Sequence, residues 1–501
     1  MRLLTFGFIA FVLSITFLQA QTVDCMKDFD FLVDKIKADY PGFNDKINPL
    51  NASKLKTLEK ELRNKIQIYP DSCSFYLKQY ASFFKDNHLR VGRVSPEQKR
   101  PEKTDISSFG RNIEINIDSL KNMMANSKTI EGIWTSWGGD IAVIKSHKPN
   151  TFLGVAIKYR NWMADQVMFE FIPVNDTTFT TVVHSTFKES TPRNGAASLH
   201  VNNNILEMHD DISFVGKTGS PAYDKAVLLT YIPQFPNGRN TFFVATSLGD
   251  STFYLRVPGF SGFKAQIEKT ISLYRTEIMS RPNMIIDIRN NSGGLDDEYQ
   301  SLSKFIYTNP YETKGVEWYA SAGNIKIFED ALKTGEIRNG EEGIQWTKAL
   351  LAEMKKNIGG FVVHPFQTNK EEVHALKDSV YNYPKRVGII INEGNASSAE
   401  QFLLGAKNSK KVTLFGNQST AGVLDYSNAI QVIFPSGNYQ LNYPMTRSTR
   451  LPENPIDNIG IKPDLFIPFP STIQLYDRLD TWVYFVKNYL EFKGIEKSIN
   501  Q

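Results

Sequence analysis

The chain has 501 residues, enough for two to four domains of ordinary size. Hydrophobic residues make up 41% and charged residues 22%, which is typical of a globular protein and excludes a disordered or membrane-embedded one. The formal net charge is only +4 and no dense stripe of lysine and arginine is present, so no nucleic-acid partner is expected.

The first twenty residues differ from the rest of the chain. Arg2 precedes an almost wholly apolar run that ends at Leu18, and the small residue Ala20 is followed by polar Gln21. This pattern predicts a signal peptide over 1–20 and export to the periplasm, the cell surface or the medium. An uncleaved anchor is the alternative, although the run is short for a membrane span. No later run is long enough to span a membrane, so the mature protein is expected to be soluble.

The segment 21–105 is expected to form a helical cap. Apolar side chains at helical spacing predict three helices, over 27–46, 52–66 and 72–85. The chain has two cysteines, Cys25 and Cys73, and an even count in an exported protein permits one disulfide. Neither cysteine lies in a metal-binding or redox spacing.

The segment 106–240 has a β-rich pattern. Short apolar or alternating runs such as 152–157 and 167–172 are separated by polar turns. Strands of this length and spacing predict an antiparallel barrel or sandwich.

The segment 241–475 alternates strands with helices, which predicts an α/β core. The runs 283–288 and 386–392 are buried-type strands, each followed by a turn and a helix. A charged, helical insertion is expected over 313–380. The chain is expected to end in a helix over about 473–492. In the division into domains, the last segment, 476–501, is assigned to this C-terminal helix.

Three segments of this core could carry chemistry, and each also has a plain structural interpretation. Paired glycines at 293–294 follow a strand, where they would let the backbone approach an anion closely. The alternative is that they only form a turn between the strand and the next helix. Ser397 stands at a strand-to-helix turn, where the helix dipole favours developing negative charge, or where serine merely caps the helix with Glu400. The third segment, 457–464, reads as a loop before an edge strand.

In this order, the segments resemble the signature of the serine peptidase family that includes C-terminal-processing (tail-specific) proteases, the tricorn core and the retinoid-binding-protein repeats. That signature comprises Asp-x-Arg-x-Asn-x-Gly-Gly, Ala-Ser-Ala-x-Glu and Gly-Val/Ile-x-Pro-Asp. The counterparts here are 287–294, 396–400 and 460–464. The resemblance covers about half of the chain and implies a crotonase-like (ClpP/crotonase-type) α/β core, with no clear PDZ domain.

The resemblance implies that Ser397 is the nucleophile. It also implies an oxyanion hole made by the backbone N–H groups of Ser398 and Gly293. The processing-protease branch activates its serine with a lysine, but the matching position here is Val423. The chain therefore resembles the tricorn-like branch, which uses an upstream histidine.

His88 has the matching context, because Asp86-Asn87-His88 follows an apolar helix. A structural or surface role is the alternative. The remaining six histidines have no matching context: His147, His184, His200, His209, His364 and His374.

The same branch adds a carboxylate that orients the histidine through a neighbouring polar residue. The matching positions are Asp457 and Asn87, with Glu453 as the alternative acid. No His-Glu-x-x-His or clustered Cys/His spacing appears, so neither a metal nor an organic cofactor is expected.

The sequence therefore predicts an exported serine peptidase that acts on peptide or protein substrates. The first alternative is a catalytically inactive protein on the same scaffold that binds a peptide or small ligand. The second is an esterase-type hydrolase, which the absence of any Gly-x-Ser-x-Gly elbow disfavours.

Overall fold

A computed structural model describes most of the chain: 24–94, 112–124, 129–136, 139–159, 162–184, 192–200, 203–208, 212–215, 243–337, 339–366, 371–374, 380–468, 475–476 and 479–499. The predicted signal peptide and His209 lie outside these residues. Among the described helices, none is long and apolar enough to cross a membrane.

The chain forms two compact units from interleaved segments. The first unit comprises 1–98, 310–375 and 421–460. The second comprises 99–309, 376–420 and 461–501. The division of the sequence into consecutive domains stays a prediction.

The first unit contains the predicted N-terminal helices. The first helix runs over 24–39 and ends before Pro41-Gly42, so the helix expected over 27–46 is interrupted there. A disulfide joins Cys25 on this helix to Cys73 at the start of α4, so the pairing that the sequence permits is formed. The elements that follow are α2 (Phe43–Lys46), α3 (Ala52–Ile68), η1 (Pro70–Ser72) and α4 (Cys73–Ser82).

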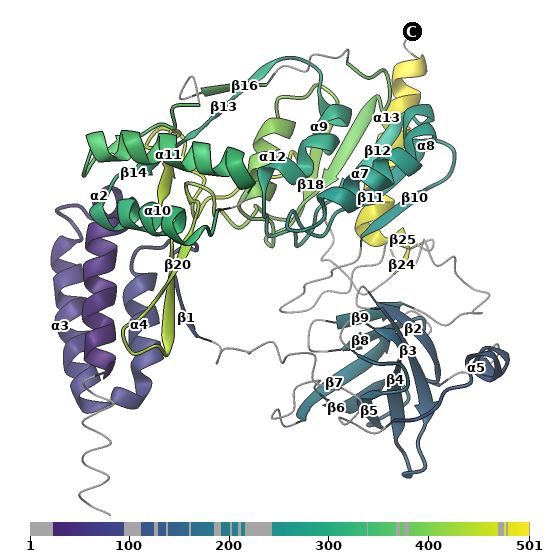
Figure 1. Ribbon diagram of the computed structural model, residues 1–501. Coiled ribbons are helices and arrows are strands. Elements are labelled where there is room, and N and C mark those ends of the chain that lie inside the picture. The colour runs from purple at the N-terminus through teal and green to yellow at the C-terminus, as the bar shows by residue number, and fades with distance from the viewer. Residues whose placement is uncertain are drawn as a thin grey trace, which may run out of the picture. The chain divides into compact units, whose positions relative to one another are not determined.

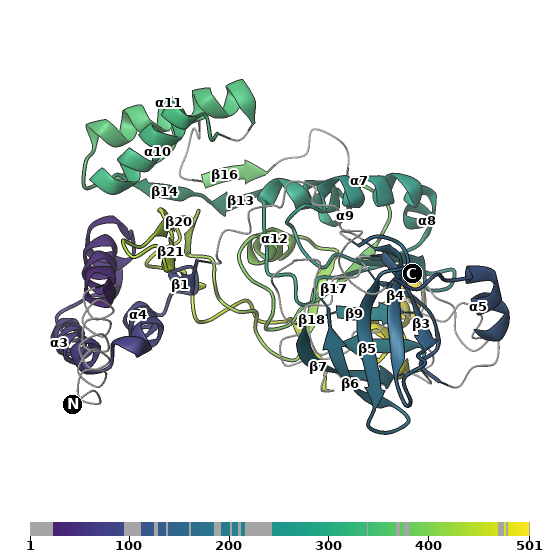
Figure 2. The same ribbon diagram turned by 60° about the horizontal axis from the view of Figure 1, so that its bottom comes forward.

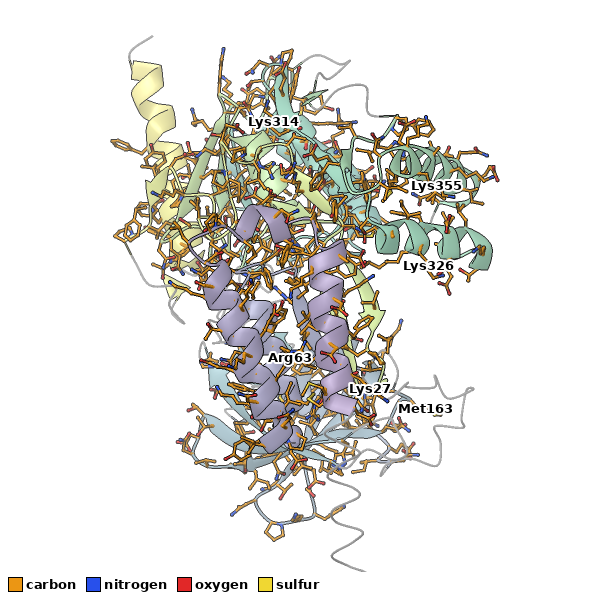
Figure 3. All side chains as sticks on the ribbon, turned by 90° about the vertical axis from the view of Figure 1, so that its left-hand side faces the viewer. Lys27, Arg63, Met163, Lys314, Lys326 and Lys355 are labelled. Atoms are coloured by element: carbon orange, nitrogen blue, oxygen red, sulfur yellow. A yellow bond between two sulfur atoms is a disulfide. The ribbon has the colours of Figure 1, made fainter. Side chains whose placement is uncertain are left out.

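The insertion expected over 313–380 is largely helical and packs within the same unit. Asn324, which is fully buried on α10, donates through Nδ2 to the carbonyl of Asp39 at 3.1 Å and accepts from the hydroxyl of Tyr443 at 2.8 Å. Figure 3 shows Lys326 and Lys355 on the two insertion helices, where each forms an ion pair with an acidic residue of α10. These helices are α10 (Ala322–Thr334) and α11 (Gly340–Lys356).

Small sheets complete the first unit. One has the order β1-β21-β20, and Figure 2 shows it next to α4. The others have the orders β15-β14-β22-β19 and β13-β16. The strands are β1 (Arg90–Arg93), β13 (Tyr311–Lys314), β14 (Val316–Tyr319), β15 (Phe361–Val362), β16 (Glu371–His374), β19 (Tyr426–Ser427), β20 (Ile430–Ile433), β21 (Tyr439–Tyr443) and β22 (Thr446–Ser448).

The β-rich segment of the second unit is a closed barrel of β2 to β9 (Figure 1). The sequence did not distinguish between a barrel and a sandwich. Pairing of Thr135 on β2 with Val215 on β9 closes the sheet into a barrel. Aromatic side chains, including Trp134 and Phe171, fill its interior. The elements are α5 (Ile117–Met124), β2 (Gly132–Ser136), β3 (Gly139–Lys145), β4 (Phe152–Tyr159), β5 (Val167–Pro173), β6 (Thr178–Val183), β7 (Arg193–His200), β8 (Ile205–Met208) and β9 (Ile212–Val215).

The predicted α/β core contains a six-stranded sheet of order β10-β11-β12-β17-β18-β23. All neighbours pair in parallel except β10, which is antiparallel to β11. The strands are β10 (Val244–Ser247), β11 (Thr252–Arg256), β12 (Asn283–Asp287), β17 (Arg386–Ile390), β18 (Val412–Gly416) and β23 (Leu465–Phe466).

Helices pack on this sheet. The C-terminal helix α13 (Thr481–Ile499) buries Trp482 and Val486 against it, and it begins later than the expected helix over 473–492. The reason is a local cap, because Asp480 accepts the N–H groups of Trp482 and Val483. The other elements are α7 (Lys264–Leu273), α8 (Arg275–Ser280), η3 (Asp296–Tyr299), α9 (Gln300–Ile306), α12 (Ser398–Ala406) and the hairpin β24 (Leu475–Tyr476) and β25 (Leu479–Asp480).

Candidate active site

Ser397 lies at a sharp junction between β17 and α12. Its backbone has φ 57° and ψ −125°, a region that residues with a side chain rarely adopt. Such a conformation costs on the order of 1–3 kcal/mol and persists only where the surroundings enforce it. The backbone N–H of Ser397 donates to Glu400 Oε2 at 3.3 Å. The resulting turn places the hydroxyl of Ser397 at the N-terminal end of a helix, where the dipole favours negative charge.

The paired glycines pack directly against this junction. Gly293 has φ 92°, and a Cβ built on it would lie 2.6 Å from the carbonyl oxygen of Ala396 and 2.8 Å from Ser397 Cβ. Only glycine fits there without displacing the backbone. The structure therefore brings together Gly293, Ser397 and Ser398, which are far apart in the sequence.

Both N–H groups of the glycine turn have partners. Gly293 N–H donates to Asn291 Oδ1 at 2.9 Å, and Gly294 N–H donates to Ser398 Oγ at 2.9 Å. The N–H of Ser398 belongs to the first turn of α12, where backbone N–H groups have no partner within the helix. An oxyanion hole of the predicted composition requires Gly293 N–H to exchange Asn291 for the oxyanion, or to share its proton between them.

Gly293→Ala is expected to abolish reactivity at Ser397. The added methyl collides with the backbone next to Ser397, and φ 92° is strained for alanine. The rate of labelling by a fluorophosphonate should fall by on the order of a hundredfold or more. Gly249→Ala is the matched control, because φ is 81° and no atom lies within 4 Å of its added methyl. Equal loss in both variants would contradict the steric explanation.

Glu400 stabilises the start of α12 through hydrogen bonds of its side chain. Its carboxylate is fully buried and accepts a hydrogen bond from Thr420 Oγ1 in addition to Ser397 N–H. The hydroxyl of Thr420 in turn accepts the N–H of Ile461 at 2.7 Å. This chain ties the junction to the third predicted segment. The capping interpretation of Glu400 therefore holds, and it is compatible with a nucleophilic serine.

A buried ion network lies at the end of β12. Arg289 contacts Asp287 at 2.7 Å and Asp480 at 3.1 Å, and Tyr254 donates its hydroxyl to Asp287 at 2.8 Å. Burial alone would raise the pKa of Asp287, but the charges and hydrogen bonds of Arg289, together with the charge of Arg256, outweigh burial and lower it. The network joins the turn that carries Asn291 to the cap of α13.

The first unit carries His88, which is half-buried in the turn that precedes β1. Its Nδ1 is buried and makes no hydrogen bond within the described part of the chain. Asp86, on the same turn, accepts the backbone N–H of His88 at 2.8 Å and the hydroxyl of Tyr40 at 2.7 Å. Burial lowers the pKa of His88, and the charge of Asp86 only partly opposes this. A general base must be in its neutral form, and the lowered pKa favours a neutral imidazole.

Asp457 is a second acid of the first unit, and its side chain is only 8% exposed. Its Oδ1 accepts the N–H groups of Leu424 and Asp425 at 2.8 Å each, and Lys46 Nζ lies 3.8 Å from Oδ2, too far for a hydrogen bond. Burial, followed by the charge of Asp86, raises the pKa of Asp457 to about 7.

The other predicted positions of the first unit have no such surroundings. Asn87 and Glu453 are exposed, and Val423 is buried where the processing branch has lysine. Sequence reasoning missed the hydrogen bonds that Asp86 accepts from Tyr40 and from the His88 backbone, although Asp86 stands in the quoted Asp86-Asn87-His88 element.

Three of the histidines without a matching context have local partners. His184 and His200 lie beside Glu170 and Glu207 in the barrel, and His364 stacks on a tryptophan with its ring centroid 4.1 Å away. Among the described residues, no group of histidine, cysteine and carboxylate side chains could hold a metal ion.

Residues 251–467 match the family model described as peptidase family S41. By that match this segment, a little under half of the chain, is assigned to a family of serine peptidases. A comparison with curated proteins finds no match.

Several solved structures are similar to the chain. Mature CPAF complexed with lactacystin shares 15% identity over 96% of this chain and 99% of that one, with a TM-score of 0.48. A putative S41 protease from Bacteroides fragilis NCTC 9343 shares 13% over 93% and 97%, with a TM-score of 0.37. The tricorn protease shares 12% over 93% and 37%, with a TM-score of 0.40. These values are low, and the assignment rests on the family model alone.

Proposed function

We propose that this chain is an exported serine peptidase that cleaves peptide bonds through an acyl-enzyme on Ser397. The observation that carries the proposal is the strained backbone of Ser397, which stands at the N-terminus of α12 against the glycine turn. A nucleophilic serine on a strand-to-helix turn is exposed to substrate and close to backbone N–H donors. The sheet β11-β12-β17-β18-β23 fits the proposed crotonase-like core, and the predicted signal peptide over 1–20 supports export.

In the proposed mechanism His88 takes the proton of the Ser397 hydroxyl as its oxygen attacks the peptide carbonyl. This step requires a ring nitrogen of His88 within hydrogen-bond reach of Ser397 Oγ. The backbone N–H groups of Ser398 and Gly293 stabilise the oxyanion. His88 then protonates the leaving amine, and water hydrolyses the acyl-enzyme.

Asp457 is the proposed acid that favours the imidazolium form of His88, acting through Asn87, with Glu453 as the alternative. The direct hydrogen bond from the His88 backbone to Asp86 fixes the turn that carries the base. The hydroxyl of Tyr40 donates a hydrogen bond to the other carboxylate oxygen of Asp86.

The test is labelling of the mature protein with a fluorophosphonate. Wild type should be labelled, and Ser397→Ala and His88→Ala should both lose labelling. Labelling that survives Ser397→Ala would identify another nucleophile. Absence of labelling in folded wild type would favour the inactive binding protein, for which the buried Val423 and the occupied Gly293 N–H are the supporting observations.

A further inference from the structure

Four asparagines lie in the two turns that meet at Ser397. Asn290 and Asn291 follow β12, while Asn392 and Asn395 follow β17. We call these four residues the asparagine clasp. Asn291 and Asn395 are fully buried, so their amide groups need partners in the protein.

Asn395 joins the two turns directly. Its Nδ2 donates to the carbonyl oxygen of Ile288 and, at 3.2 Å, to that of Asn291. Its Oδ1 accepts the N–H of Asn392 at 2.8 Å. The donors face carbonyl groups and the acceptor faces an N–H group, so only an amide in this orientation satisfies all three contacts.

The other members of the clasp extend the same connection. Asn392 accepts the N–H of Asn290 through Oδ1 at 2.8 Å and donates through Nδ2 to Asn290 Oδ1 at 2.8 Å. Asn291 accepts the N–H of Ala396 through its carbonyl at 3.3 Å. Ala396 is the residue before the nucleophile, so the clasp ends at the strained position.

We propose that the clasp asparagines are positioning residues that hold Ser397 in its reactive conformation. The φ and ψ of Ser397 are unfavourable for an isolated serine, so contacts on both sides of it must enforce them. Glu400 holds the helical side, and the clasp holds the strand side. This inference rests on the proposed role of Ser397 as nucleophile.

Asn395→Asp tests the clasp with little change of shape. An aspartate replaces the donor that faces Ile288 and Asn291 with an oxygen, so two bonds are lost and the oxygens repel one another. The maximal rate of fluorophosphonate labelling should fall on the order of 10- to 100-fold, while the affinity for the probe stays nearly unchanged. A merely structural role would lower the melting temperature without moving the rate per folded molecule.

A second, milder variant keeps the test decisive where Asn395→Asp fails to fold. Asn290 has φ 62°, which glycine adopts freely, so Asn290→Gly removes one bond of the clasp without straining the backbone. Labelling should slow by roughly two- to tenfold. Asn150→Gly, at φ 48° in a barrel turn, is the control for the added backbone freedom.

Asn324→Asp is the matched control for charge and burial. Asn324 is equally buried and makes donor and acceptor bonds in the first unit. This variant should lose stability but keep the labelling rate. If Asn324→Asp slowed labelling as much as the clasp variants do, the inference would be overturned. It would also be overturned if both clasp variants were labelled at the wild-type rate while Ser397→Ala was not labelled. Either result would leave the proposed role of Ser397 standing. Failure of the proposed function is distinct, because wild type would be unlabelled or Ser397→Ala would still react.

Discussion

Arg289→Met is expected to destabilise the parallel sheet of the second unit by about 3–5 kcal/mol. Arg289 is 2% exposed and is the counterion of both Asp287 and Asp480. Methionine fills similar space but leaves two buried carboxylates without that cation. Arg289→Lys should recover only part of the loss, because an ammonium group cannot reproduce the paired contacts of a guanidinium.

The effect of Arg289→Met should depend on pH in a defined direction. Because Arg289 lowers the pKa of Asp287 in the folded protein, their ion pair stabilises the fold above the unfolded pKa of about 3.9. This contribution is lost as the pH falls through the lower folded pKa. The deficit of the variant should therefore be full at pH 7 and shrink in acid.

Denaturant unfolding and hydrogen–deuterium exchange would measure this loss. Exchange should accelerate in β12 and α13, with the barrel strands as the internal reference. Lys264→Met is the control, because its pair with Asp297 in the same unit is exposed and should contribute little. Wild-type stability of Arg289→Met would mean that the two carboxylates are accommodated without the guanidinium.

The local elements of the core could be predicted from sequence because their signals are local. The apolar run that contains Ile285 and Ile286 has the length of a buried strand, and glycine follows it where the backbone needs φ 92°. The position of Ser397 at the start of a helix followed from the same pattern. Its strained backbone did not, since φ and ψ there depend on contacts with a turn about a hundred residues away.

The interleaving of the two units could not be predicted from sequence. The sequence predicts only a charged, helical insertion over 313–380, and the bonds of Asn324 to Asp39 and Tyr443 show where its helix α10 packs. Likewise, burial of Asp457 near Asp86 is a long-range effect, because nothing in the sequence near either residue marks a raised pKa.

Asp457→Asn is expected to stabilise the first unit at alkaline pH while it impairs catalysis. The folded pKa of about 7 exceeds the unfolded value of about 3.9, so folding binds a proton between these values. The contribution of Asp457 to wild-type stability is therefore full below about pH 4 and is lost as the pH rises through 7. About three pKa units at about 1.36 kcal/mol each give a cost of about 4 kcal/mol above pH 7.

Asparagine avoids this cost and keeps the local bonds. Its Oδ1 can still accept the N–H groups of Leu424 and Asp425. The gain in unfolding free energy of Asp457→Asn over wild type should thus be near zero at pH 4 and largest at pH 8. Asp71→Asn, an exposed aspartate of the same unit, is the control and should show no such gap.

Activity of the same variants decides what the buried acid does. If Asp457 favours the imidazolium form of His88, Asp457→Asn should lower kcat by on the order of a hundredfold or more while the melting temperature at pH 8 rises. Gain of stability with loss of activity is the expected mark of a strained functional group. A stabilised and fully active Asp457→Asn would remove Asp457 from the mechanism, and loss of activity in Glu453→Gln would transfer its role there.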